Sequence, residues 1–184
     1  MTGWNVPFLM ELSLQNNNLT RIPIGIEKHP NLTTLLLANN LLSVVDLRRL
    51  EGWDILQTID LAGNRIRNVM ITGSGRLTLP GLKRVDLSNN QLARLEFVRW
   101  DFPKLSSMAL AFNRFQRFPN LWKMFPELGN VIAFQNPLLC EAVRNLQQLI
   151  STMRLIVDAS GFGTPCTTNA TFTLQSGRVI CCVE

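Results

Sequence analysis

Few residues in this chain of 184 have the chemistry of a catalytic site. There is one histidine, His29, no tyrosine, and no glycine-rich loop that could hold a phosphate. Asp60 and Asp86 hold equivalent positions in a repeated pattern, and paired carboxylates can carry out glycoside hydrolysis. Two solvent-facing acids with Arg84 nearby to compensate their charge explain the pair more simply. We therefore predict that the chain is not an enzyme and uses no cofactor.

The other reactive side chains are four cysteines, all within the last 45 residues. No C-x-x-C pair is present, and His29 lies far from them in the sequence. This spacing does not favour zinc, so no metal site is expected. Disulfide bonds in an oxidising compartment and free thiols in the cytosol are the two alternatives. The cysteines are Cys140, Cys166, Cys181 and Cys182.

Arginine dominates the positive charge, with 14 Arg against 4 Lys and a formal net charge of +5. The guanidinium fork binds carboxylate, sulfate and phosphate in a bidentate way, which favours an acidic or sulfated partner. No recognised module or stacking platform accompanies the charge, so nucleic acid is not an expected partner. Six arginines follow a recurrent asparagine by one to four residues: Arg21, Arg65, Arg67, Arg94, Arg114 and Arg117.

The elements that position these residues come from a pattern, L-x-x-L-x-L-x-x-N-x-L, present in six copies. The first copy is Leu9, Leu12, Leu14, Asn17 and Leu19, and the sixth and weakest runs from Leu128 to Leu138. Successive asparagines are 23, 24, 26, 23 and 23 residues apart. A fixed period of this kind marks a solenoid. The asparagines are Asn17, Asn40, Asn64, Asn90, Asn113 and Asn136.

This consensus resembles that of the leucine-rich repeat family. The alternation L-x-L predicts a strand with two leucines on one face, and stacked copies bury that face in a continuous core. The predicted fold is an α/β solenoid, a leucine-rich-repeat horseshoe with a parallel β-sheet on the concave face, an irregular convex side and a C-terminal helical cap. The resemblance implies that the asparagine side chains form a ladder to adjacent coils, so they are structural.

Three segments are predicted: an N-terminal edge at 1–8, six repeats at 9–138 and a cysteine-containing cap at 139–184. The start of the chain lacks the features of a signal peptide, and no apolar run is long enough to cross a membrane. Extracellular members of the family usually carry a cysteine-bearing N-terminal cap. Because no such cap is present, we expect that the chain is a piece of a longer protein or that a minimal apolar edge takes the place of the cap.

The end of the sixth copy, Asn136-Pro137-Leu138-Leu139-Cys140, resembles the N-P-x-x-C start of the extracellular C-terminal cap. A helix is predicted over 141–154 because its apolar residues recur at helical spacing. The family usually has C-x-C, whereas Ala142 stands at the second position, so the usual bridges cannot both form. Either Cys140 and Cys166 each bond one of the adjacent pair Cys181-Cys182, or one bridge forms and thiols remain for an intermolecular bond.

Three N-glycosylation triplets, beginning at Asn18, Asn31 and Asn169, favour an extracellular location. A longer third repeat holds a Gly- and Ser-rich bulge at 72–76, which we interpret as a flexible loop.

The predicted concave face is small and polar in its middle and apolar toward its C-terminal end. Phe112, Ile132 and Phe134 converge on neighbouring coils there, and exposed apolar clusters mark interaction sites. Packing under the C-terminal cap is the alternative. The predicted partner-binding residues are Arg84, Arg94, Phe112, Arg114, Arg117, Ile132 and Phe134.

The sequence thus predicts a recognition module that binds a protein ligand or co-receptor. We expect it on the cell surface or outside the cell, within a longer receptor, adhesion or secreted defence protein of innate immunity or signalling. An intracellular leucine-rich-repeat scaffold for signalling proteins is the alternative.

Overall fold

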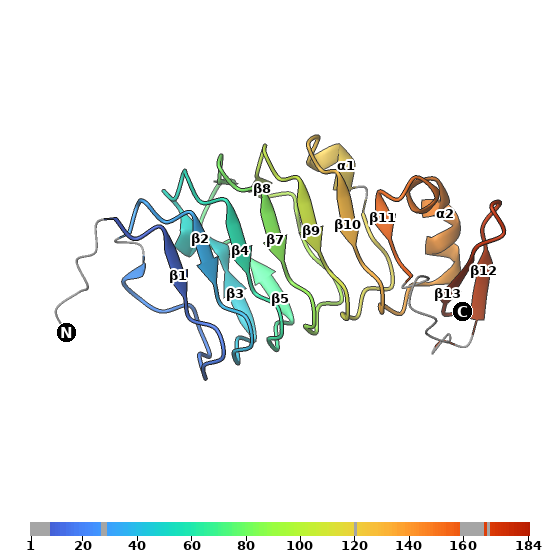
Figure 1. Cartoon of the computed structure of the whole chain (residues 1–184), viewed down its shortest axis with the longest axis horizontal. Coiled ribbons are helices and arrows are strands. Elements are labelled where there is room, and N and C mark those ends of the chain that lie inside the picture. The colour runs from blue at the N-terminus through green and yellow to red at the C-terminus, as the bar shows by residue number, and fades with distance from the viewer. Residues whose placement is uncertain (1–7, 27–28, 120, 159–167, 169) are drawn as a thin grey trace.

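One long parallel sheet runs along the molecule, with its strands side by side like the rungs of a ladder (Figure 1). The computed structural model describes residues 8–26, 29–119, 121–158, 168 and 170–184. Each predicted copy contributes one of the first six strands, which confirms the predicted solenoid. The strands, in sheet order, are β1 (Glu11–Ser13), β2 (Thr34–Leu36), β4 (Thr58–Asp60), β7 (Arg84–Asp86), β9 (Ser107–Ala109), β10 (Asn130–Ile132) and β11 (Leu155–Ile156).

The strands form because one apolar residue of each points into a core shared by all coils. Leu35, Ile59 and Val85 are in register on β2, β4 and β7, and each is at most 4% exposed. Their strand neighbours face outward and are only partly buried. The first coil packs less tightly, since Leu12 is half-buried. Side-chain alternation therefore separates the core from an outer face.

Five asparagines connect each coil to the one before it. Asn64 donates through Nδ2 to the Leu37 and Leu61 carbonyl oxygens, both 3.0 Å away, and its Oδ1 accepts from the Leu42 N–H at 3.1 Å. Asn40, Asn90, Asn113 and Asn136 make the same set of bonds. The predicted ladder is confirmed for these five. Asn17 differs, because it is exposed and donates only within its own coil.

The residue before each of these asparagines has a left-handed backbone. Its φ lies between 54° and 65° in every coil. Asparagine and glycine adopt this conformation at low cost, whereas a side chain with a bulky ring does not. The residues are Asn16, Asn39, Gly63, Asn89, Phe112 and Gln135.

The opposite side of the coils is built from short pieces, as predicted. Strand β3 (Val44–Asp46) pairs with β5 (Asn68–Met70), and β6 (Leu77–Thr78) pairs with β8 (Trp100–Asp101). A 3₁₀ turn, η2 (Leu47–Leu50), and the short helix α1 (Leu121–Met124) complete this side. Buried rings of Phe97, Trp100, Phe102 and Phe125 pack together between these pieces and the long sheet.

The C-terminal end is closed by helix α2 (Cys140–Ser151) and a hairpin of β12 (Ala170–Thr173) and β13 (Val179–Cys182) (Figure 1). The helix prediction of 141–154 extended too far. The chain turns at Met153, which has a φ of 57° and is 52% exposed, and β11 then joins the long sheet beside β10. The Leu155-x-Val157 pair, 24 residues after Val131-x-Ala133, is the signal for this seventh strand. Across the described residues, no helix is both long and apolar enough to cross a bilayer.

Candidate binding surfaces

An apolar shelf lies at the C-terminal end of the long sheet, and we define it as Phe112, Ile132, Phe134 and Ile156. The rings of Phe112 and Phe134 meet edge to face with centroids 5.3 Å apart. Ile132 and Ile156 are register partners on β10 and β11, and both are half-buried. Phe112 is 51% exposed, so the described residues of the cap do not bury it. Strand β11 instead extends the shelf by Ile156, which the sequence prediction missed.

The backbone at Phe112 makes this shelf unusual. Its φ is 54°, at the position where four coils have Asn16, Asn39, Gly63 or Asn89 and the next coil has Gln135. A left-handed backbone costs a residue with a β-carbon about 1–2 kcal/mol, and the short amide of asparagine offsets part of that cost. Phe112 thus combines an unfavourable backbone with an exposed ring. Stability does not explain this choice of residue, and such outliers cluster at functional sites.

The middle of the outer face holds the two predicted carboxylates, Asp60 and Asp86. They are register partners on β4 and β7. Each closes a turn, because Asp60 Oδ1 accepts from the Ala62 N–H at 2.9 Å and Asp86 Oδ1 accepts from the Ser88 N–H at 2.8 Å. Burial raises the pKa of Asp60, the charge of Asp86 raises it further, and the Ala62 N–H acts in the opposite sense. These contacts give both acids a structural role.

The structure divides the predicted partner-binding arginines between two surfaces. Arg84 lies on β7 and faces outward from the long sheet. Arg94, Arg114 and Arg117 lie beyond the asparagine turn, on the flank that leads away from the sheet. Arg65 and Arg67 hold the same flank in the third coil, on either side of the buried Ile66. We define the arginine edge by the five exposed arginines of the third, fourth and fifth coils, without Arg21 of the first coil: Arg65, Arg67, Arg94, Arg114 and Arg117.

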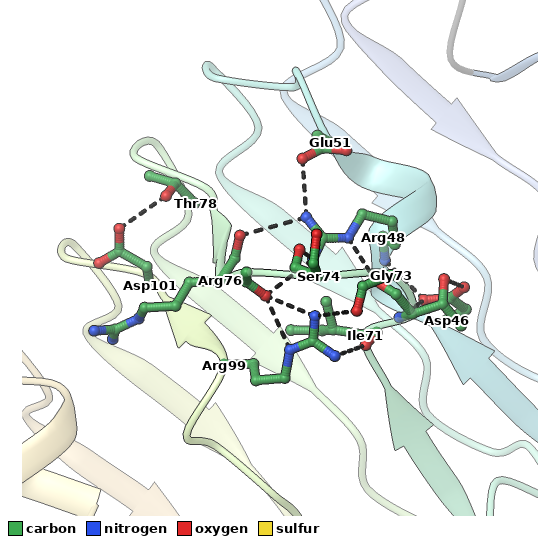
Figure 2. A network of polar contacts seen from close by, with 12 residues as sticks. Asp46, Arg48, Glu51, Ile71, Gly73, Ser74, Arg76, Thr78, Arg99 and Asp101 are labelled. Atoms are coloured by element: carbon green, nitrogen blue, oxygen red, sulfur yellow. Dashed lines mark hydrogen bonds and ion pairs between the residues drawn. The ribbon is translucent and has the colours of Figure 1, made fainter.

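The bulge at 72–76 is held in place by arginines from both neighbouring coils (Figure 2). Arg48 donates to the carbonyl oxygens of Thr72, Ser74, Gly75 and Arg76, at 2.9–3.3 Å. Our interpretation of the loop as flexible did not anticipate these bonds.

On the other side of the bulge, Arg99 donates to the carbonyl oxygens of Ile71, Gly73 and Gly75, at 2.6–2.9 Å. Asp46 accepts from the Thr72 N–H at 3.1 Å and from the Thr72 hydroxyl at 2.6 Å. Burial raises the pKa of Asp46, but the hydrogen bonds from Thr72 and the Arg48 N–H outweigh it and lower the pKa.

The cap is crosslinked by a disulfide between Cys140 and Cys182, which joins the start of α2 to the end of β13. Cys181 is disulfide-bonded as well. The first predicted alternative, in which Cys140 and Cys166 each bond one of the adjacent pair, is therefore confirmed for Cys140. Cys166 lies outside the described residues. Within those residues, no group of three or more His, Cys, Asp or Glu could hold a metal ion.

Two of the three predicted glycosylation sites, Asn18 and Asn31, are exposed. Asn169 lies outside the described residues.

Comparison with known proteins gives one family and several relatives. Residues 7–66 match the family described as Leucine rich repeat. The chain is 30% identical over 118 residues to Leucine-rich repeats and immunoglobulin-like domains protein 2 of Mus musculus, which is 62% of this chain and 11% of that protein. It is 33% identical over 138 residues to Podocan-like protein 1 of Mus musculus, which is 74% of this chain and 24% of that protein.

The chain therefore spans a quarter or less of the length of these two relatives. The solved structure of a TLR13–ssRNA13 complex matches 70% of this chain and 18% of that chain, with a TM-score of 0.59 and 24% sequence identity. A likeness at that identity concerns the fold.

Proposed function

Because the chain belongs to the leucine-rich repeat family, we propose that it is a recognition module that binds a protein partner through the apolar shelf. The observation that carries this proposal is Phe112, a half-exposed ring on a left-handed backbone. Phe134 supports the ring from the next coil, and Ile132 and Ile156 continue the apolar surface across two strands. Buried aromatic side chains carry much of the binding energy in typical interfaces.

Arg84 contributes charge on the same outer face, on β7. In this proposal its guanidinium contacts a carboxylate or carbonyl oxygen of the partner beside the apolar anchor. Arg94, Arg114 and Arg117 extend the contact where the partner passes the ends of the strands.

A binder is first sought by probing an array of secreted and cell-surface proteins with the chain as a multivalent fusion. Two variants then test whether it binds the shelf. For any binder found, we expect Phe134→Ser to weaken the affinity about 30-fold, equivalent to about 2 kcal/mol. The matched control is Val98→Ser, since Val98 is 72% exposed and lies next to β8 on the other side of the coil. Equal affinities of Phe134→Ser and Val98→Ser for the binder would rule out the shelf as its binding site.

Phe112→Asn separates binding from folding. It places at this turn the residue found in three other coils, so relief of the backbone offsets the lost contact with Phe134. We expect the free energy of unfolding to stay unchanged or rise by up to about 1 kcal/mol, while the affinity for the partner falls as it does with Phe134→Ser. A clear loss of stability in urea unfolding would show that Phe112 is a packing residue.

We propose an extracellular or cell-surface location, and the disulfide between Cys140 and Cys182 supports it. Disulfides persist in oxidising compartments and are rare in the cytosol. The exposed Asn18 and Asn31 are proposed to carry N-linked glycans there, and Asn169 remains a third prediction. The competing function, an intracellular signalling scaffold, would require reduced cysteines.

Thiol titration of protein purified without reductant, under denaturing conditions, distinguishes the two locations. We expect Cys140, Cys181 and Cys182 to be unreactive until a reductant is added, because all three are disulfide-bonded. Four reactive thiols per chain would favour the intracellular scaffold.

The prediction that nucleic acid is not a partner has no support from the comparisons. One solved structure that shares this fold is a TLR13 complex with ssRNA13. RNA is therefore included as a competing ligand in the experiment below.

A further inference from the structure

The arginine edge is a second exposed surface, separate from the apolar shelf. Backbone bonds between coils fix its position, since the Arg65 N–H donates to the Leu42 carbonyl oxygen at 2.9 Å and the Arg114 N–H to that of Leu92 at 2.8 Å. Alternate residues on this flank, such as Ile66 and Phe115, are buried. The arginine side chains between them therefore extend into solvent.

Most guanidinium groups of this edge have no carboxylate partner. Of the five arginines of the edge, only Arg117 forms an ion pair within the described residues, with Glu141 at 3.0 Å, and both side chains are 61% exposed. Exposed pairs of this kind contribute little. Arg67 donates to the Gln91 side chain, which is neutral. The edge therefore carries most of its positive charge uncompensated.

The repeat places these charges at regular intervals. Arg94 and Arg117 both follow their asparagine by four residues, in adjacent coils, and neighbouring coils are about 5 Å apart. Arg65 and Arg114 both follow by one residue, two coils apart, which is about 10 Å. Like charges side by side are destabilising. Most arginines of this row have no ion-pair partner, which is unfavourable for folding alone, and a bound row of anions would relieve the repulsion.

We propose that the arginine edge binds a linear sulfated polysaccharide. Guanidinium groups bind oxyanions in a bidentate way, and a polymer with repeated sulfates matches a row of cations set by the coil spacing. The disulfide-linked cap supports an oxidising compartment, where such polysaccharides occur. Arg94, Arg114 and Arg117 are shared with the protein contact proposed above, whereas the apolar shelf takes no part in binding the polysaccharide.

Single-stranded nucleic acid fits this surface less well. Proteins that bind it combine a basic groove with aromatic rings on which successive bases stack. The residues exposed between the arginines are small or amide side chains, such as Asn68, Ala93 and Gln116. Phe112 is the one exposed ring near the edge among the described residues, and it is engaged with Phe134.

Heparin is the probe for this proposal, with affinity measured by titration calorimetry over a range of salt concentrations. The test variant is Arg94→Gln/Arg114→Gln. The control is Arg49→Gln/Lys104→Gln, which removes the same charge at exposed positions, on η2 and at the start of the fifth repeat. We expect the test variant to lose about tenfold in affinity and to release about two fewer counterions, as read from the slope of log affinity against log salt concentration. The affinity of the control should stay within about twofold of wild type.

Three outcomes would overturn the proposal. The first is no binding of heparin at about 50 mM salt. The second is an equal loss in the test and control variants, which would mean that net charge alone acts. The third is tighter, arginine-dependent binding of single-stranded polyuridylate or of polyglutamate than of heparin. Phe112→Asn should leave heparin binding unchanged, so failure of this site and failure of the apolar shelf are distinguishable.

Discussion

Replacing Asn90 with alanine is expected to lower the free energy of unfolding by about 2–3 kcal/mol. The side chain is 8% exposed, donates to the Leu61 carbonyl oxygen at 3.0 Å and accepts from the Ile66 N–H at 2.9 Å. Alanine would leave the buried Ile66 N–H without this partner and would remove one of the two side-chain donors to the Leu61 carbonyl oxygen, the other being Asn64 Nδ2. Urea unfolding followed by circular dichroism gives the difference.

Asn17→Ala is the matched control for Asn90→Ala. It is the same change at the same repeat position, but Asn17 is exposed and donates only to Leu14 and Gln15 of its own coil. We expect it to cost less than about 1 kcal/mol, because the groups it releases can bond to water. Equal losses from the two variants would show that the bonds between coils are not the source of the effect.

Removing the disulfide with Cys140→Ser/Cys182→Ser is expected to cost about 2–4 kcal/mol. The bridge spans 42 residues of sequence and connects α2 to β13, so it restricts the unfolded chain and holds the hairpin against the last coil. Cys182 is fully buried, and serine there would also bury a hydroxyl. Thermal unfolding of oxidised protein, with limited proteolysis of the cap, measures the loss.

The control for the disulfide variant is Val179→Ser on the same hairpin, where the side chain is 50% exposed. We expect it to be nearly neutral and the cap to remain resistant to protease. A double variant with an unchanged midpoint and an intact cap would contradict a stabilising role for the bridge.

The sequence predicted those features that the repeat specifies residue by residue. The positions of Leu35 and Asn64 recur in each copy, so the first six strands of the long sheet and the asparagine bonds between coils followed from spacing alone. Strand β11 was missed because Thr152 and Ser160 stand where the copies have the first leucine and the asparagine, and a helix comes before it. Two residues of strand are too few to signal themselves.

Other features depend on contacts that leave no pattern in the sequence. Arg48 and Arg99 bind backbone carbonyl oxygens, which every residue has, so no pairing of residue types indicates these bonds. The exposure of Phe112 was anticipated, but its backbone was not, although Asn and Gly at the equivalent positions indicate a left-handed turn. The binding role of the apolar shelf and of the arginines stays a prediction.

The clamped bulge has a consequence for how the molecule opens. In a solenoid each coil contacts only its neighbours, so local opening can stop at any boundary between coils. The bulge of the third coil bonds both to Arg48 in the second and to Arg99 in the fourth. Separating either neighbour breaks bonds that also order the bulge. Amide protons of these three coils should therefore exchange with solvent as one cooperative unit, while the first coil exchanges independently.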